Sequence, residues 1–364
     1  MVWSSNVDII CPASSPGARA ASVDELGYRA AMDVTEAIGN TPLIELKRVA
    51  AGLPNKVFVK CEHLNPGGSV KDRTARAIIL DAEARGVLRP HEGMTIIEGT
   101  AGNTGMGLAL IAASRGYRCV VVIPERVAAD KRVALRQVGA EVYVAKVGGI
   151  KSPDNFRNVA ARLAEEHGWF LANQFHNPAN LDAHYGGKGT TATGPEIVAQ
   201  MSGQLGAFVA AAGTGGTISG AGRYIKEHVP GVKVVLADPI GSGLGEWINT
   251  GTLGPDGPFA IEGIGSASVP SNLHRDAIDF AEKIADAEAF AMTERLVKEE
   301  GLTVGGSSGV NVVAALRVAA RADVHGPVVT LACDLWDRYR STAWMKAWEE
   351  RELRDVVFLQ PTKV

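Results

Sequence analysis

A single lysine stands between a glycine turn and the start of a predicted helix. Residues 65–75 read NPGGSVKDRTA. The Pro-Gly-Gly run predicts a turn, and Ser69 followed by Asp72 has the spacing of a capping box, so a helix should begin near Ser69. Lys71 then lies in the first helical turn, where the helix dipole disfavours a cation. Such a lysine is either a solvated surface residue or an amine kept neutral, the form that condenses with an aldehyde to a Schiff base.

Glycine-rich loops occur at three further places along the chain. They read GTAGNTG (99–105), GTGGT (213–217) and GGSSG (305–309), the last after a short LTV run. Each follows a predicted strand and opens a predicted helix. In an open parallel sheet the loops at the carboxyl ends of the strands line one crevice. We therefore expect these loops to build one site.

The GTGGT loop has the composition of a phosphate-binding turn. Its glycines allow close backbone approach, successive N–H groups can bind an anion, and Thr214 and Thr217 can donate hydroxyl hydrogen bonds. A tight turn that only packs a helix on a strand is the alternative. Ile218 stands at the third glycine position of a dinucleotide fingerprint, and the sequence has no P-loop motif. A phosphate site without a nucleotide fingerprint, combined with a neutral lysine, indicates pyridoxal 5′-phosphate.

Short apolar runs alternate with helical patterns from residue 34 onward. Such runs are typical of strands buried on both faces, and the helices between them predict βαβ units with mostly parallel sheets. The runs cover residues 57–60, 95–98, 119–123, 141–145, 207–212, 233–237 and 328–332. We expect two three-layer α/β domains that separate near the turn-rich residues 175–185, with the active site in the cleft between them. Residues 1–33, rich in Ser, Ala and Pro, are expected to form an N-terminal arm.

Composition and charge exclude several classes of protein. The chain has 364 residues, 46% of them hydrophobic, and a net charge of −3, so neither nucleic acid nor a membrane surface is an expected partner. The four cysteines form no C-x-x-C pair, which argues against a metal site or disulfides and favours the cytoplasm. We expect Cys61 and Cys119 in the core. The uncharged span 197–222 has seven glycines, which indicate a buried strand, loop and helix. Asp8 and the Cys11-Pro12 pair stand where an export signal would need an apolar run, so none is expected in the first residues.

The order of the motifs resembles that of one enzyme family. IGNTPLIEL (38–46) is followed in order by NPGGSVKDRTA, EGTAGNTGMGLA, NQFHNPAN, GTGGTISG, EGIG and GGSSG. This set resembles the cysteine synthase and cystathionine β-synthase family of fold type II pyridoxal phosphate enzymes, over residues 34–345. The resemblance implies a tryptophan synthase β-like fold, with the lysine in a domain at 34–178 and the phosphate loop in a domain at 179–364. It also implies that the first strands can cross to the other domain, and it implies a homodimer.

The resemblance assigns roles to matching residues. Lys71 falls at the Schiff-base lysine, Asn103 at the asparagine that bonds the 3′ oxygen of the cofactor, and Ser307 at the serine facing the pyridine nitrogen. The phosphate loop corresponds to Gly213, Thr214, Gly215, Gly216 and Thr217. The positions that hold the substrate carboxylate are Thr100, Asn103, Thr104 and Gln174. Gly263 and Ile264 fall in the loop that closes over the substrate amine. On the residues alone, Asn103 could instead be a turn residue with positive φ, and Ser307 a helix N-cap.

The residue types at these positions favour chemistry at the β carbon of an amino acid. A neutral hydroxyl such as Ser307 does not hold the ring nitrogen protonated as an aspartate would, which favours prompt loss of a β leaving group over transamination. Lys71, once displaced by the substrate amine, becomes a base beside Cα. The family match then implies formation of L-cysteine from an activated serine, O-acetylserine, and sulfide through an aminoacrylate.

Other activities of the same site stay open at this stage. An L-cysteine desulfhydrase, a cystathionine β-synthase and a catalytically silent binding partner are the alternatives. The chain departs from the common family pattern at Ala101, where a serine is frequent, and at Cys333, Asp334 and Trp336, where small residues are common. EGIGSASVPSNL lacks the usual aromatic, and GGKG at 186–189 also differs. These departures leave the substrate uncertain. His184 is expected to be structural, and residues 125–132 a solvated helix face.

Overall fold

A computed structural model describes residues 33–100, 102–149, 151–186 and 191–354. The expected N-terminal arm therefore lies outside the described residues except for Asp33. Ala101 and most of the GGKG segment also lie outside them.

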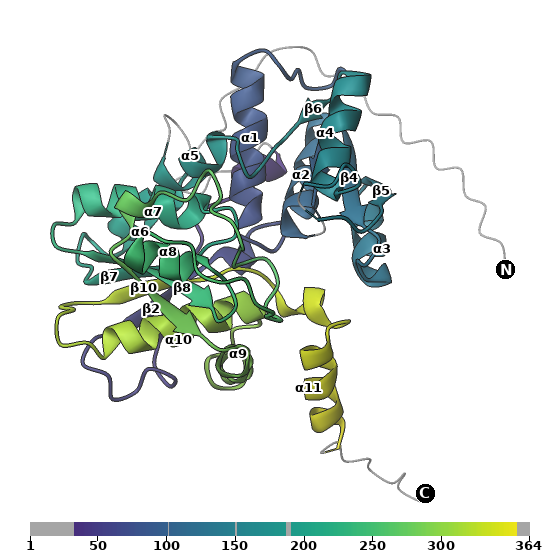
Figure 1. Cartoon of the computed structure of the whole chain (residues 1–364). Helices are drawn as coiled ribbons and strands as arrows, with labels where there is room; N and C mark the ends of the chain where they lie inside the picture. Colours follow the sequence, from purple (N-terminus) through teal and green to yellow (C-terminus); the bar gives the residue numbers. More distant parts are fainter. Residues whose placement is uncertain (1–32, 101, 150, 187–190, 355–364) are drawn as a thin grey trace, which may run out of the picture.

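Two sheets form the framework of the molecule (Figure 1). The larger has six strands in the order β1 (Leu43–Leu46), β2 (Val57–Cys61), β10 (Val328–Ala332), β7 (Ala207–Ala211), β8 (Lys233–Pro239) and β9 (Phe280–Ile284). The smaller has four, in the order β5 (Glu141–Ala145), β4 (Arg118–Pro124), β3 (Thr95–Gly99) and β6 (Phe170–Leu171). All neighbouring strands are parallel except β1 and β2. This confirms the predicted fold class.

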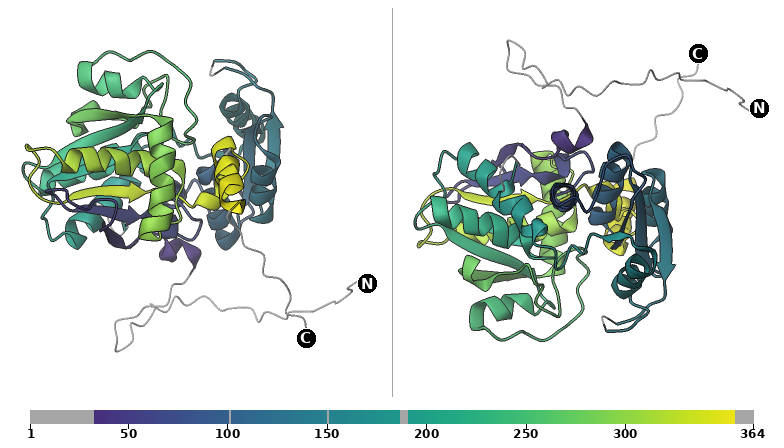
Figure 2. Two further views of the ribbon diagram at one scale, coloured as in Figure 1. Left: turned by 90° about the horizontal axis from the view of Figure 1, so that it is seen from below. Right: turned by 90° about the horizontal axis from the view of Figure 1, so that it is seen from above.

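Helices cover both faces of each sheet, which gives three layers (Figure 2). The smaller sheet lies between α1 (Lys71–Ala84) with α2 (Asn103–Arg115) and, on the other face, α4 (Phe156–His167). The larger sheet lies between α9 (Asp286–Glu300) with α10 (Gly306–Ala319) and a layer of α6 (Thr193–Gln200), α7 (Gly216–His228) and α8 (Leu244–Thr250). The other described α-helices are α3 (Ala129–Gln137), α5 (Ala179–Tyr185) and α11 (Ala343–Leu353).

Alternation along the strands distributes the apolar side chains between the layers. In β3, Ile96 packs on the α1 and α2 side, whereas its neighbour Ile97 packs on the α4 side. Both are completely buried, which explains why the strands read as continuous apolar runs. Cys61 and Cys119 lie in these cores, as expected.

The predicted runs all form strands, but the sequence reading missed β1, β6 and β9. β6 has only two residues, and β9 (FAEKI) carries two charged ones. The LTV run before GGSSG is not a strand, because Val304 makes only an isolated bridge with Leu335. Residues 179–185 of the turn-rich segment form α5.

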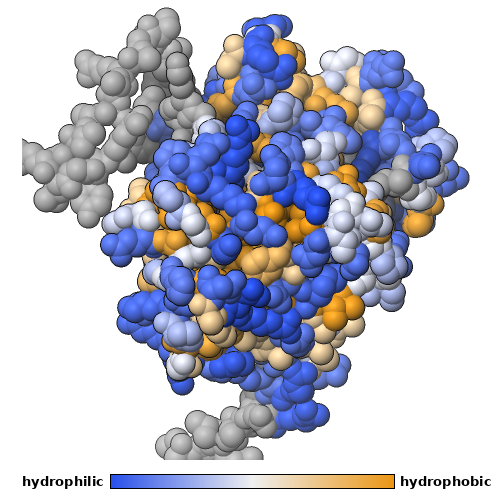
Figure 3. Space-filling view, turned by 60° about the vertical axis from the view of Figure 1, so that its left-hand side comes forward, coloured by the Kyte–Doolittle hydropathy of each residue, from blue (hydrophilic) through white to orange (hydrophobic). Residues whose placement is uncertain are grey.

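The described surface is largely polar on the face shown in Figure 3, with apolar residues in separate areas. Among the described residues, no helix combines the length and apolarity needed to span a bilayer.

Candidate active site

The loop that carries Lys71 is fixed to the carboxyl end of the central strand β10. Val70 donates its backbone N–H to the carbonyl of Cys333 at 2.8 Å, and Ser69 pairs with Asp334 as an isolated bridge. Leu335 donates in turn to the carbonyl of Gly68 at 3.2 Å. Lys71 then begins α1, which leaves the larger sheet and packs on the smaller one. The lysine therefore lies where the two halves of the molecule meet.

The start of α1 differs from the predicted capping box. The N-cap position is Val70, and the hydroxyl of Ser69 accepts the N–H of Lys71 at 3.2 Å. The carboxylate of Asp72 accepts instead the N–H of Gly67 at 2.5 Å, inside the turn. The capping-box prediction was wrong because the Pro-Gly-Gly turn folds back far enough for Asp72 to bind it.

The surroundings of Lys71 favour its neutral amine. Burial lowers the pKa of Lys71, and the nearby Asp334 opposes this only in part. Burial also raises the pKa of the Cys333 thiol to about 12, so this neighbour is uncharged at neutral pH. A neutral amine is the form that the proposed Schiff-base chemistry needs.

Asn103 is the first residue of α2, and its side-chain amide is held at both ends. Its Nδ2 donates to Oδ2 of Asp334 at 2.6 Å, and its Oδ1 accepts a short hydrogen bond from Arg338. The alternative interpretation as a turn residue with positive φ is wrong, because Asn103 is helical and is not among the described residues with positive φ.

Ser307 lies near the same point, in the first turn of α10. Its side chain is buried, and its hydroxyl lies within hydrogen-bonding reach of the Cys333 thiol. The N-cap residue of α10 is Gly305, so the alternative interpretation of Ser307 as an N-cap is wrong. The Cys333–Asp334 segment thus brings Lys71, Asn103 and Ser307 together.

The GTGGT loop has the shape of a cradle for a phosphate. Gly215 has φ +88° and caps α7, which starts at Gly216. A Cβ on Gly213 would collide with the carbonyl of Gly263, and one on Gly216 would collide with Asn180. The loop therefore needs glycine at these positions, and it presents backbone N–H groups at a helix N-terminus. These residues fit the phosphate of pyridoxal phosphate.

The two threonines of this loop already have partners in the protein. Thr214 accepts a hydrogen bond from Asn180 at 2.9 Å, and Thr217 bonds Nε2 of His184 at 3.1 Å. The other ring nitrogen of His184 bonds Thr193 at 2.8 Å. Complete burial lowers the pKa of His184 well below its ordinary value, so the ring is neutral. Its two hydroxyl partners agree with the expected structural role.

Asn180 links the phosphate loop to the lysine helix. Besides Thr214, it accepts from the Thr74 hydroxyl on α1 at 3.1 Å and donates to the carbonyl of Gln174 at 2.7 Å. Thr74 lies about one helical turn after Lys71. Sequence reasoning quoted Asn180 within NPAN but gave it no role.

Two of the residues expected to hold the substrate carboxylate contact each other directly. The Thr104 hydroxyl donates to Oε1 of Gln174 at 2.6 Å, and Nε2 of Gln174 donates to the buried carboxyl of Glu98 at 3.2 Å. Burial raises the pKa of Glu98 to about 7. Thr100, also buried, follows β3 at the start of the same loop. Sequence reasoning missed Glu98.

Gly263 and Ile264 lie next to Gly213 of the phosphate loop. The carbonyl of Gly263 approaches Gly213, while the Ile264 side chain packs into the core of the larger sheet. Glu262, just before them, pairs with Lys131 of α3. Lys131 is 19% exposed, and its contact with Glu262 lies at the surface. Of the segment 125–132, expected as a solvated helix face, only residues 129–132 are helical.

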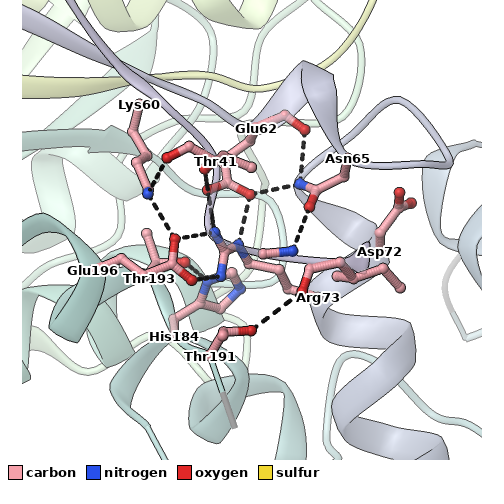
Figure 4. A network of polar contacts seen from close by, with 12 residues as sticks. Thr41, Lys60, Glu62, Asn65, Asp72, Arg73, His184, Thr191, Thr193 and Glu196 are labelled. Carbon is pink, nitrogen blue, oxygen red and sulfur yellow. Dashed lines mark hydrogen bonds and ion pairs between the residues drawn. The ribbon is translucent and has the colours of Figure 1, made fainter. Parts of the chain in front are cut away.

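A buried ionic network connects the lysine loop and α1 to the larger half of the molecule (Figure 4). Lys60 is completely buried and binds Glu196 at 2.6 Å. Arg73, two residues after Lys71, binds Glu62 through Nε at 2.7 Å and also binds Glu196. Thr41 donates to Oε1 of Glu62, and Asn65 donates to Oε2. The network joins β2, the lysine loop, α1 and α6, and its pairing could not be read from the sequence.

Comparison with known proteins agrees with this site. The family model described as pyridoxal-phosphate dependent enzyme matches residues 34–334. Cysteine synthase 1 of Neurospora crassa is 43% identical over 328 residues, which cover 88% of this chain and 85% of that protein. Cystathionine β-synthase of Apis mellifera is 40% identical over 333 residues, 90% of this chain and 64% of that protein.

Solved structures share the fold as well. O-ureido-L-serine synthase superposes with a TM-score of 0.78 at 35% identity, covering 88% of this chain and 99% of that one. An O-acetylserine dependent cystathionine β-synthase from Helicobacter pylori gives a TM-score of 0.76 at 36% identity, covering 86% and 98%.

The fold and the site together define a pyridoxal phosphate enzyme of fold type II. The phosphate cradle, the lysine with its lowered pKa and the parallel sheets all agree with that class. The chain belongs to the pyridoxal-phosphate-dependent enzyme family, and within it to the cysteine synthase and cystathionine β-synthase group.

Proposed function

We propose that this enzyme forms L-cysteine from an activated serine, O-acetylserine, and sulfide by β-replacement. The observation that carries the proposal is the placement of Lys71, whose pKa is lowered by burial, beside Asn103 and Ser307. Relatives that bear the name cysteine synthase support the choice of product.

The chain's own residues then divide the work. When bound, the cofactor supplies an electron-withdrawing ring joined to the amino acid nitrogen. Lys71 takes the proton from Cα, because its neutral amine can act as a base. Thr100, Thr104 and Gln174, with the N–H groups at the start of α2, hold the substrate carboxylate. Ser307 offers a neutral hydroxyl to the ring nitrogen, which favours loss of the β substituent.

A second candidate is the synthesis of cystathionine from the same donor. The Helicobacter pylori enzyme named O-acetylserine dependent cystathionine β-synthase supports it, because its structure matches over most of both chains. In this version homocysteine replaces sulfide as the nucleophile. A cysteine desulfhydrase, which releases sulfide, remains a third use of the same site.

One set of assays separates these functions. The purified holoenzyme is incubated with O-acetylserine and sulfide, with O-acetylserine and homocysteine, and with cysteine alone. The products cysteine, cystathionine and sulfide are then quantified. The proposal expects the highest kcat/KM for cysteine formation, and faster cystathionine formation or sulfide release would overturn it.

Three further expectations belong with this proposal. The division into a domain at 34–178 and one at 179–364 follows the family resemblance. A homodimer follows it too, and size-exclusion chromatography with light scattering tests it. A cytoplasmic location is supported by the free thiols of Cys61, Cys119 and Cys333.

A further inference from the structure

Asp334 is a buried carboxylate next to the lysine loop that the proposed mechanism does not use. Its side chain is only 2% exposed. Oδ2 accepts hydrogen bonds from Asn103 at 2.6 Å and from the phenol of Tyr339. Oδ1 has no hydrogen-bond partner among the described residues. Burial of a carboxyl group is costly unless it is compensated, so its presence at this position indicates a function.

The contacts of Asn103 show what this carboxylate controls. A guanidinium has only donors, so Arg338 can bind only the Oδ1 of the amide. Nδ2 must then face Oδ2 of Asp334, an oxygen that also accepts the hydrogen bond of the Tyr339 phenol. A flipped amide would set donors against Arg338 and acceptors against Asp334. Arg338 and Asp334 therefore determine which way the amide faces, and the second N–H of Nδ2 has no partner within the part of the chain that the structure describes.

The same segment also holds the lysine loop. Arg338 donates through its other nitrogen to the carbonyl of Gly67, and the backbone of Asp334 pairs with Ser69. The turn Trp336–Tyr339 thus connects the loop before Lys71 to the first residue of α2. Tyr339, which ends this turn and donates to Asp334, is also buried.

We propose that Asp334, together with Arg338, is a positioning residue that fixes Asn103 as a hydrogen-bond donor toward the bound pyridoxal phosphate. This rests on the proposed function only in so far as the site binds that cofactor. It concerns cofactor binding and its electronic state, not the choice of substrate.

The test uses the variant Asp334→Asn, which keeps the size of the side chain. Its amide can either donate or accept, so Asn103 loses the enforced orientation. We expect the Kd of the apoprotein for pyridoxal phosphate to rise roughly tenfold or more, as for loss of a charge-assisted hydrogen bond. We also expect the visible absorption band of the bound cofactor to titrate at a different pH. Asp279→Asn is the matched control. Asp279 accepts the backbone N–H of Val234 at the start of β8, the end of that strand away from its carboxyl end. This variant should change neither the Kd nor the pH at which the band titrates.

A double variant distinguishes positioning from general damage. In Asn103→Ala the donor is already absent, so adding Asp334→Asn should not raise the Kd further. A remaining shift of the band in the double variant reports the direct effect of Asp334 on Lys71. Wild-type behaviour of Asp334→Asn, or an additional full rise of the Kd in the Asn103→Ala background, would overturn the inference. Circular dichroism checks folding. If Asp334→Asn does not fold, Tyr339→Phe, which removes one donor to Oδ2, should raise the Kd by less, again only when Asn103 is present.

The readouts need no substrate. A wild-type protein that binds the cofactor but forms no cysteine would refute the proposed function and leave this inference intact.

Discussion

Arg73 donates two hydrogen bonds to the carboxylate of Glu196, one from each terminal guanidinium nitrogen and each 2.7 Å long. The arginine lies on α1 two residues after Lys71, and the glutamate lies on α6. The helix that begins with the proposed catalytic lysine is therefore anchored to the larger half of the molecule by a buried charge pair.

Glu196→Gln should destabilise the fold strongly. It leaves the buried cations of Lys60 and Arg73 with a neutral partner, and breaking a buried pair from one side costs about 3–5 kcal/mol. Urea unfolding monitored by circular dichroism measures the change. Glu141→Gln is the control, because its pair with Arg118 is exposed and should contribute less than ~1 kcal/mol. Equal losses in both variants would contradict the expectation.

The same carboxylate predicts an acid-dependent loss of stability. Burial alone would raise the pKa of Glu196, but Arg73 and Lys60 lower it from 4.5 to about 2. A depressed pKa contributes stability above the unfolded value, and this contribution is lost as the pH falls from 4.5 toward 2. The free energy of unfolding of the wild type should fall more steeply across this range than that of Glu196→Gln. Parallel curves would argue against the charge pair.

Glu98 should give the opposite pH dependence, a stability that falls as the pH rises. Its pKa is raised from 4.5 to about 7 by burial, so the folded state favours the protonated form. Stability is then lost as the pH rises through this window, by roughly 3 kcal/mol at full ionisation. Glu98→Gln resembles the protonated side chain and should lose much less stability between pH 5 and pH 8. Thermal melts of both proteins at several pH values provide the comparison.

Gly216→Ala should weaken cofactor binding. The added methyl would meet the side chain of Asn180, which holds both the phosphate loop and Thr74. We expect the Kd for pyridoxal phosphate to rise by about tenfold or more, since a shift of the loop disturbs its N–H groups. Gly149→Ala is the control, because nothing lies within 4 Å of the position where its Cβ would be. An unchanged Kd in Gly216→Ala would show that the loop accommodates the methyl.

Lys71→Ala should fold but lose the covalent link to the cofactor and all turnover. The side chain makes no hydrogen bond among those found in the described residues, so its removal should change stability little. Mass spectrometry after borohydride reduction detects the link in the wild type. Retained turnover in the variant would refute the role proposed for Lys71.

The sequence predicted most of the framework for a physical reason. Strands buried on both faces, such as β4, give continuous apolar runs that interrupt the helical patterns. β9 escaped notice because only one of its residues is fully buried, and β1 because a charge interrupts a four-residue strand. The placement of β1 and β2 beside β10 depends on long-range pairing, for which a single sequence carries no local signal.

The phosphate loop of the site was predictable, because its backbone conformation depends on residues that are neighbours in the sequence. Glycines at 213, 215 and 216 are required by close approach, and such positions are visible as a motif. Asp334, Arg338 and Asn180 act through contacts between segments far apart in the chain, such as Asn103 with Asp334. Their roles follow from the fold and not from spacing. Sequence reasoning noticed Asp334 only as a departure.

The location of β10 between β2 and β7 also bears on how the molecule is made. Ribosomes release the chain from its N-terminus, so strands β3 to β6 can assemble into their sheet early. The larger sheet has to wait, because its central strand β10 follows all its other strands in the chain. Until residues 328–335 emerge, the loop before Lys71 lacks its backbone partners, and the nascent polypeptide carries an unassembled active site.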